Sequence, residues 1–369
     1  MRISMGLIFA VLLFTGCTNN QLPGDFMLGK KMELDTSLSS PKGYPIDIVQ
    51  GYNAYRDENG NLMGGFFAPR VKGGWDDPEG TAMGRMDRLP HRVHLLWFSL
   101  AENQFYELDA ELPVERMKEL YKEGFRLVSY DRVNDRPVGE YDTYSGIGFM
   151  LAPGGGVVAK MLAREAREIG YFKAKKIDMP WHIFQNVTPD RIESGDREKF
   201  VASGLSEERI GKEARDEILG HKIPFGLWDE VYRRTYPWSM HIVHPLALEK
   251  YYIEFVNTER YMVWEYQVTK EHNRVGTPVP AFFGVYFITP EGKRMVGLVK
   301  FDLRKTTKLF EEYFKNISER ANLDVKVSDD LKSVEVKLVN SQKSVVVPHR
   351  IWKVNELYKD NWGFDTMDW

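Results

Sequence analysis

The chain has 369 residues, of which 43% are hydrophobic, 13% aromatic and 28% charged, and this composition excludes a disordered, collagen-like or low-complexity protein. Lys and Arg total 50 and Asp and Glu total 53, so a net charge of −3 leaves no overall basic field to hold DNA or RNA. The single cysteine excludes an intrachain disulfide and a cysteine-based zinc cluster.

Residues 1–16 have the layout of a lipoprotein signal peptide. Arg2 gives the charged start, and the apolar run that follows is too short to cross a bilayer as a permanent helix. The run ends in LFTGC, which resembles the lipobox of bacterial lipoproteins. This resemblance implies cleavage before Cys17, lipid attachment to its thiol and, because Thr18 replaces Asp, sorting to the outer membrane with the body facing the periplasm. An ordinary secretory signal with a chance cysteine is the alternative.

The body of the chain is expected to be β-rich. Residues 17–40 are polar and weakly periodic, which predicts a tether. Residues 41–177 are expected to form a first unit, in which a hairpin at 91–112 precedes a helix over 114–123. Proline before this helix and glycine just past its end support the boundaries.

Residues 246–358 repeat this order as a second unit. A hairpin over 281–301 precedes a helix that Asp302 can cap, and three strands follow. The stretch VVAKMLA at 157–163 has helical propensity, but its counterpart VEVKLVN alternates, so both are predicted to be strands. The shared order favours a tandem duplication, with two unrelated α+β domains as the alternative.

Residues 178–245 are expected to be a helical insert. One helix is predicted from Ser206 to Gly220, and a second over residues 228–236, before Pro237. The predicted fold class is therefore α+β and β-rich: two tandem related units, each a mostly antiparallel sheet with one crossing helix, joined by a helical insert.

Several stretches resemble one family of Gram-negative lipoproteins, described as domain of unknown function 2931. They are PKGYPIDI, LPHRVHLLWFSLAENQFYELDAELP, GFMLAPGGGVV and IPFGLWDEVYRRTYPW. The family has no established catalytic residues, so the resemblance assigns none here. It suggests a context, since lipoproteins of this kind can act as immunity proteins that neutralise antibacterial phospholipase effectors of type VI secretion.

No metal, cofactor or catalytic site is expected. His91 and His94 lie three apart in a predicted strand and should point to opposite faces, and Pro245 disfavours the helical turn on which His241 and His244 could share a metal. HExxH and GxSxG motifs are lacking, and no Lys-Ser/Thr follows the glycine run at 154–156 as in a phosphate-binding loop. The carboxylates are too numerous to exclude a paired acid and base.

Two regions are candidates for binding a protein partner. Trp228, Tyr232, Arg233 and Arg234 are of the types that dominate interface hot spots, although the aromatic residues could instead form the inner face of a helix that locks the units together. The aromatic tail, residues 359–369, should bury its rings on the body or on a partner, and it includes Trp362 and Trp369.

The first hypothesis is therefore a membrane-anchored periplasmic lipoprotein that binds another protein, such as a toxic secreted effector. A second is an envelope enzyme acting on lipid or glycan, with a site between the two units. A third is a structural lipoprotein of the envelope.

Overall fold

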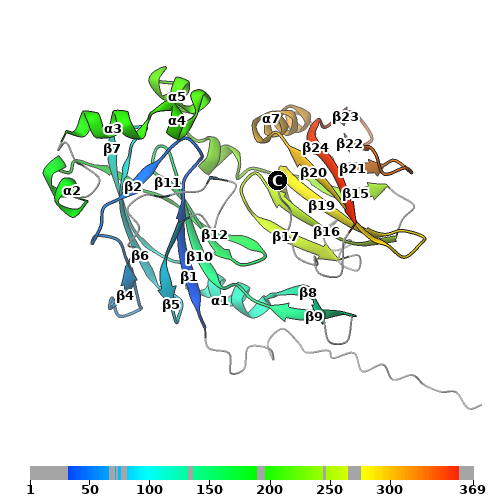
Figure 1. The fold of residues 1–369 in the computed structure, drawn as a ribbon, viewed down its shortest axis with the longest axis horizontal. Coiled ribbons are helices and arrows are strands. Elements are labelled where there is room, and N and C mark those ends of the chain that lie inside the picture. The colour runs from blue at the N-terminus through cyan, green and yellow to red at the C-terminus, as the bar shows by residue number, and fades with distance from the viewer. Residues whose placement is uncertain are drawn as a thin grey trace, which may run out of the picture.

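The computed structural model describes residues 32–65, 71, 74–75, 81–131, 136–188, 196–243, 247–264 and 276–356 (Figure 1). The predicted fold class is confirmed: the chain is β-rich, with mostly antiparallel sheets and a few short helices. Two β-rich units lie side by side, and a helical connection joins them. None of the helices in the described part is both long and apolar enough to cross a membrane.

The first unit is a sandwich of two sheets with one helix. One sheet has the order β5-β1-β10-β11-β12 and the other the order β13-β7-β6-β3-β4, with β2 also paired to β6. Its elements are β1 (Leu34–Ser39), β2 (Ile46–Ile48), β3 (Ala54–Arg56), β4 (Leu62–Gly65), β5 (Thr81–Met86), β6 (Arg92–Ser99), β7 (Gln104–Glu111), α1 (Val114–Glu123), β8 (Phe125–Asp131), β9 (Arg136–Asp142), β10 (Gly146–Ala152), β11 (Gly156–Leu162), β12 (Ala166–Lys173) and β13 (Lys175–Ile177).

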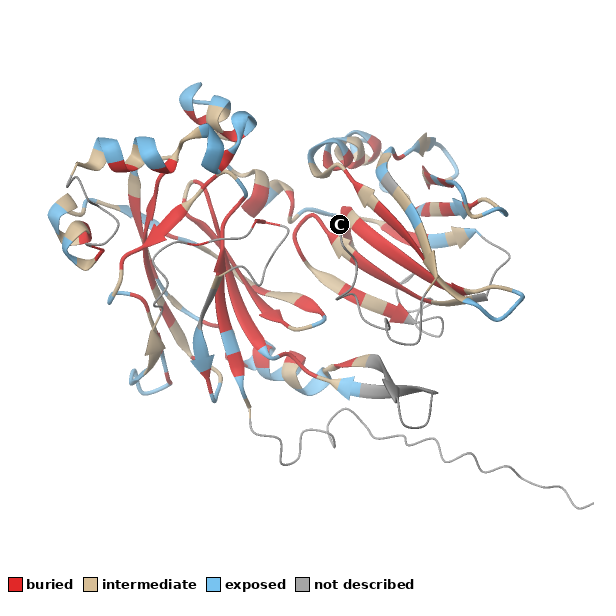
Figure 2. Cartoon of the chain, in the orientation of Figure 1, coloured by how far each residue is buried: buried red, intermediate tan, exposed pale blue. Residues whose placement is uncertain are grey.

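The two sheets of the first unit face each other across one hydrophobic core. Phe149 and Met161 from one sheet and Trp97 from the other are at most 1% exposed and belong to the same cluster. Helix α1 contributes Met117 and Leu120 to this core, which explains its apolar stripe. Figure 2 shows the buried strands surrounded by helices and turns that are largely exposed.

The second unit is built in the same way. Its sheets have the orders β17-β16-β19-β20-β24 and β15-β21-β22-β23, and α7 packs into the core between them. Its elements are β14 (Thr235–Tyr236), β15 (Trp238–Val243), β16 (Ala247–Phe255), β17 (Arg260–Trp264), β18 (Thr277–Pro278), β19 (Pro280–Ile288), β20 (Arg294–Phe301), α7 (Leu303–Phe314), β21 (Ala321–Val327), β22 (Val334–Val339), β23 (Ser344–Val346) and β24 (His349–Glu356).

The strand pairing of the two units corresponds step by step. β1 pairs with β10 in parallel, as β15 does with β21, while β3–β6–β7–β13 and β16–β19–β20–β24 are both antiparallel series. The meander β10–β11–β12 likewise corresponds to β21–β22–β23. The duplication itself stays a prediction, and this shared order is the feature it would explain.

One sheet continues from the first unit into the second. β12 pairs with β17 through Ala166 and Arg260, which links the two five-stranded sheets into a ten-stranded one. Between the units the chain forms α2 (Trp181–Val187), α3 (Arg197–Gly204), α4 (Glu207–Ile210), α5 (Lys212–Leu219) and the π-helix η2 (Leu227–Val231).

The predicted tether extends too far. Residues 34–39 form β1, which lies between β10 and β5, and Leu34 and Leu38 are completely buried. The segment contains few apolar letters, but its Thr and Ser side chains are buried as well because neighbouring strands cover both sides. Residues 1–31, which include the predicted signal peptide and Cys17, lie outside the described residues.

The predicted insert also differs from the structure. Residues 235–243 form β14 and β15 of the second unit, and the predicted helix over 228–236 is only the short η2, because Tyr236 pairs with Thr277 instead. The helix predicted from Ser206 is split into α4 and α5 at Gly211, whose φ of +80° interrupts the helix.

Other local predictions are confirmed. α1 spans 114–123, and residues 156–162 are strand β11 despite their helical propensity. The Asp302 side chain caps α7 by accepting a hydrogen bond from the Lys305 amide at 3.1 Å.

Candidate functional site

The aromatic side chains predicted to bind a partner lie inside the molecule. Trp228 and Tyr232 have 6% and 2% of their surface exposed and belong to a core shared with the second unit. The Trp228 ring packs edge-on against Tyr44, with 4.9 Å between the ring centroids. This burial favours the alternative, in which these rings form an inner face between the units, over a role in binding a partner.

The two arginines after η2 hold the units together. Arg233 donates through Nε and Nη2 to the Glu168 carboxylate on β12, at 3.0 and 2.6 Å, and its guanidinium lies 4.5 Å from the Tyr171 ring centroid. Arg234 forms an ion pair with Glu311 on α7. Arg233 is thus a link within the chain, whereas Arg234, whose side chain is 54% exposed, stays a candidate contact residue.

A fully buried aspartate on η2 lies beside the glycine run of the first unit. Asp229 has no exposed surface, accepts a hydrogen bond from Tyr171 Oη at 3.0 Å, and lies 3.5 Å from Lys173 Nζ. A Cβ at Gly156 would lie 2.0 Å from the Asp229 carboxylate, so only glycine fits there. The glycine run therefore allows η2 to pack directly on β11.

The stretches that carry the family resemblance meet around η2. Tyr44 and Gly156 both contact it, and the amide of Gly154 donates to the carboxylate of Glu102, in the β6–β7 turn, at 3.1 Å. These contacts are mostly buried. The resemblance thus follows a packing centre of the fold.

A buried lysine forms the polar centre of the contact between the units. Lys160 on β11 has no exposed surface, and its Nζ donates to the carbonyl oxygen of Asn257 in the β16–β17 turn. Burial lowers the pKa of Lys160 to about 8, against the attraction of Glu259 and Glu168. Burial alone would raise the pKa of Glu259. Its attraction to Lys160 and Arg167, together with hydrogen bonds from the Glu168 amide and the Asn257 side chain, lowers the pKa instead.

A second charged pair lies at the same contact between the units, since Arg167 also attracts Glu259. Arg167 Nη2 lies 3.2 Å from the Glu165 carboxylate, and its guanidinium lies 4.2 Å from the ring centroid of Tyr261 on β17. Glu165 also accepts a hydrogen bond from the amide of Met262 at 3.2 Å, and its burial raises its pKa. Titratable groups of both signs therefore converge where the two units meet.

The remaining predicted site residues lie outside the described part of the chain. These are Cys17 and, in the tail, Trp362 and Trp369. In the described part, no group of three or more His, Cys, Asp or Glu side chains is arranged to hold a metal ion. His241 lies 2.9 Å from Asp324, and His244 is not among the described residues.

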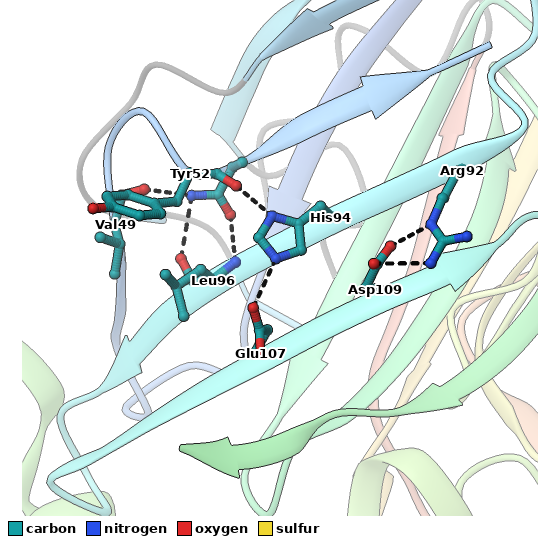
Figure 3. Close-up of polar contacts among 8 residues, drawn as sticks. Val49, Tyr52, Arg92, His94, Leu96, Glu107 and Asp109 are labelled. Carbon is teal, nitrogen blue, oxygen red and sulfur yellow. Dashed lines mark hydrogen bonds and ion pairs between the residues drawn. The ribbon is translucent and has the colours of Figure 1, made fainter. Parts of the chain in front are cut away.

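The outer face of the β6–β7 hairpin offers a more accessible site. At one end Phe98 and Phe105 are covered by Phe184 of α2 and Phe200 of α3. The other end carries Arg92, His94, Glu107 and Asp109, together with the nearby Tyr52 (Figure 3). We call these five residues the open face; their side chains are partly exposed, from 25% for His94 to 47% for Asp109, and Tyr52 is 42% exposed.

His94 is held between two acceptors in the open face. Its Nδ1 lies 2.6 Å from the carbonyl oxygen of Tyr52, and its Nε2 lies 3.0 Å from a Glu107 carboxylate oxygen. Only a ring that carries a proton on both nitrogens satisfies both oxygens. These two oxygens therefore fix the orientation of the His94 ring on this surface.

The neighbouring ion pair and a buried amide fix the open face. Arg92 donates to both carboxylate oxygens of Asp109, at 2.5 and 2.9 Å, and this attraction lowers the pKa of Asp109. Asn53 joins the chain before β3 to β6, because it accepts from the Leu96 amide at 2.6 Å and donates to the Val49 carbonyl at 2.6 Å.

Sequence reasoning found the hairpin but not these pairs. In the register, His94 lies opposite Asp109, so the contacts with Glu107 and from Arg92 to Asp109 run diagonally across the two strands. The turn length between the strands was the signal that could have set this register.

The sequence matches the model of one protein family. The family described as protein of unknown function, DUF2931, matches residues 16–226, which is more than half of the chain. The chain belongs to the DUF2931 family. None of the curated proteins and none of the solved structures matches it.

The DUF2931 match covers the first unit and most of the helical connection. The open face and the glycine run both lie within it, whereas the second unit lies beyond residue 226. Within the described residues, the open face is therefore a feature of the part that this protein shares with its family.

Proposed function

We propose that this DUF2931 protein is an outer-membrane lipoprotein, anchored through Cys17 and facing the periplasm, that binds another protein through its open face. The partner we propose is a secreted antibacterial effector, which the protein neutralises. The observation that carries the proposal is the preformed set of accessible charged pairs on the β6–β7 hairpin.

Accessible, prearranged charges support recognition of a protein. Arg92 and His94 are already held by carboxylates, so little side-chain freedom is lost when a partner binds. Charges of both signs favour a partner with a complementary pattern over nucleic acid, and the exposed Tyr52 adds an aromatic contact of the type enriched in interfaces.

The second unit provides an internal comparison. Its equivalent face, on β16, β19 and β20, carries an apolar cluster in which Tyr252, Phe282 and Leu298 are at most 6% exposed. The fold therefore does not require a polar surface at this position. On that face Lys250 and Glu254 each contact a tyrosine, so the ion pairs of the open face are not required by the fold, which supports a function for the open face.

A charge swap tests the proposal. The full chain with Arg92→Asp and Asp109→Arg keeps an ion pair of reversed polarity, so its stability should change little while partner recognition is lost. A matched control exchanges the exposed pair Glu115 and Lys118 on α1, which lies 2.8 Å apart.

The readouts are capture of the partner and protection of the cell. The wild-type chain and the α1 swap should retain a stoichiometric effector from a competing strain and protect a deletion strain in co-culture. The open-face swap should do neither. The proposal fails if all three chains behave alike, or if deletion leaves survival in co-culture unchanged.

A second candidate is an envelope enzyme acting on lipid or glycan between the units. The convergence of Lys160, Glu165, Arg167 and Glu259 at the junction favours it. Hydrolysis of lipid or glycan by the wild-type chain, abolished by Glu259→Gln in a folded variant, would support this function over the first.

A further inference from the structure

The contact between the two units joins strands that have counterparts elsewhere in the molecule. β12 is the last strand of the first meander, and β17 is the second strand of the β16–β17 hairpin. By the shared strand order, β12 corresponds to β23, and β17 corresponds to β4. The contact therefore joins the last strand of the β10–β11–β12 meander, which we call the meander edge, to the β16–β17 hairpin of the other unit.

Both counterparts are exposed at the ends of their sheets. In the described part of the chain, β4 and β23 have no second hydrogen-bonded neighbour, and Figure 1 shows them at opposite ends of the molecule. Leu62 on β4 is 65% exposed and Val346 on β23 is 55% exposed. β5 also approaches β4 without pairing with it, and a Cβ on Gly84 of β5 would lie 3.6 Å from the carbonyl oxygen of Gly65.

The two hairpin turns have the same backbone structure. In the β16–β17 turn, the amide of Phe255 donates a hydrogen bond to the carbonyl of Glu259 at 2.9 Å. The amide of Thr258 donates to the carbonyl of Phe255 at 2.8 Å. In the β3–β4 turn, the amide of Asp57 likewise donates to the carbonyl of Asn61, and the amide of Gly60 donates to the carbonyl of Asp57, both at 3.0 Å. Thr258 and Gly60 both have positive φ, and Asn257 corresponds to Asn59.

The meander edges also carry the same side chain. Lys160 lies two residues before the end of β11, and Lys337 lies two residues before the end of β22, on the outer face in both cases. Lys160 is buried under the Asn257 turn, whereas Lys337 is 37% exposed and pairs with Glu335 at 2.8 Å. The second unit thus presents the same lysine without a covering turn from the described residues.

We propose that a second copy of this chain repeats the contact between the units. The hairpin tip, residues 57–62 of one molecule, docks on the meander edge of the next, formed by Lys337, Ser344 and Val346. Ser344 then pairs with Leu62 as Ala166 pairs with Arg260, and Lys337 donates to the carbonyl of Asn59. This contact uses different surfaces on the two molecules, so it leaves one free end of each kind and extends into a chain.

A second copy is the occupant that the structure favours. The contact it would form already exists within the molecule, with its backbone pairing and its lysine–carbonyl hydrogen bond. Two short edge strands with exposed apolar residues are otherwise open templates for pairing. The contact does not involve the open face, so it is independent of the proposed function.

Cysteine pairs test the contact. In the full chain with Cys17→Ser, Leu62→Cys and Ser344→Cys should form intermolecular disulfides, because directly paired antiparallel strands bring Cα atoms within bridging distance. The double variant should give a ladder of dimers, trimers and higher species on non-reducing gels. The two single variants mixed together should give dimers only, and each alone should give little product by this route.

The controls separate the proposed geometry from random collision. Leu219→Cys replaces Leu62→Cys in the control pair, since Leu219 is 60% exposed on α5 and lies away from the contact. Leu62→Lys and Val346→Lys should each abolish concentration-dependent association in sedimentation, and mixing them should restore a dimer. Crosslinking no greater than in the control, or a double variant that stops at a dimer, overturns the proposal.

Discussion

Replacing Lys160 with methionine should destabilise the protein, and the loss should grow as the pH rises above 8. Lys160 is completely buried between the units and attracts Glu259, which is partly buried. At pH 7, removing one partner of a buried charge pair leaves the other uncompensated, which costs about 3 kcal/mol.

The pH dependence follows from the shifted pKa of Lys160. Its value falls from 10.5 to about 8 in the folded protein because burial disfavours the charged amine. Between these values the unfolded chain binds the proton and the folded chain does not, so raising the pH stabilises the folded state. The full difference between the two pKa values corresponds to about 3 kcal/mol of unfolding free energy. The wild type gains this stability as the pH rises, at a slope approaching about 1.4 kcal/mol per pH unit.

Urea unfolding of the wild type and the Lys160→Met variant at several pH values from 7 to 9.5 measures this effect. The variant lacks the titrating amine, so the gap in unfolding free energy should widen above pH 8. Tyrosines with raised pKa values, such as Tyr171, are common to both proteins and do not affect the gap. Val158→Ala, on the same face of β11, is the control whose loss should stay constant with pH.

A gap that is constant from pH 7 to 9.5 would refute the reasoning. It would mean that water or a rearrangement solvates Lys160 in the folded state, so that its pKa is close to that of the unfolded chain. A variant more stable than the wild type at pH 7 would show that the amine is less favourable than an apolar side chain there, even with Glu259 nearby.

Three further variants test the packing. Gly156→Ala should lower the unfolding free energy by about 3 kcal/mol, because the added Cβ would overlap the Asp229 carboxylate. The control Gly64→Ala should be nearly neutral, because no atom lies within 4 Å of a Cβ at that position. Thermal unfolding compares the two variants with the wild type. Trp228→Ala should cost about 3–5 kcal/mol in urea unfolding, as for a core residue. Asp302→Ala should cost about 1 kcal/mol through loss of the α7 cap, measured in the same way, and an unchanged midpoint would contradict that role.

Local patterns predicted the elements whose structure is set by neighbouring residues. The β6–β7 hairpin, α1 and the capped α7 depend on alternation, on a proline and a glycine at helix ends, and on an aspartate at the first turn. Residues 157–163 have helical propensity, but comparison of the two halves of the sequence predicted a strand there, and strand β11 confirms it.

Features that depend on distant contacts were not predicted. Residues 34–39 become a strand only because β10, more than a hundred residues later, pairs with them. Trp228 and Tyr232 fit either an exposed interface or an inner face between the units, and only their contacts with the second unit and Tyr44 decide for the inner face. The charge cluster around Lys160 is assembled from both units, so no window of the sequence contains it.

Lys160 and Lys337 show why residue type alone could not assign a role. They occupy the same position in corresponding strands, yet one is fully buried and the other is partly exposed. The difference lies in what packs above them: a turn of the same chain covers the first, and no turn among the described residues covers the second. If a neighbouring molecule supplies that turn, the contact that fixes the two units within one chain is also the contact that assembles several chains.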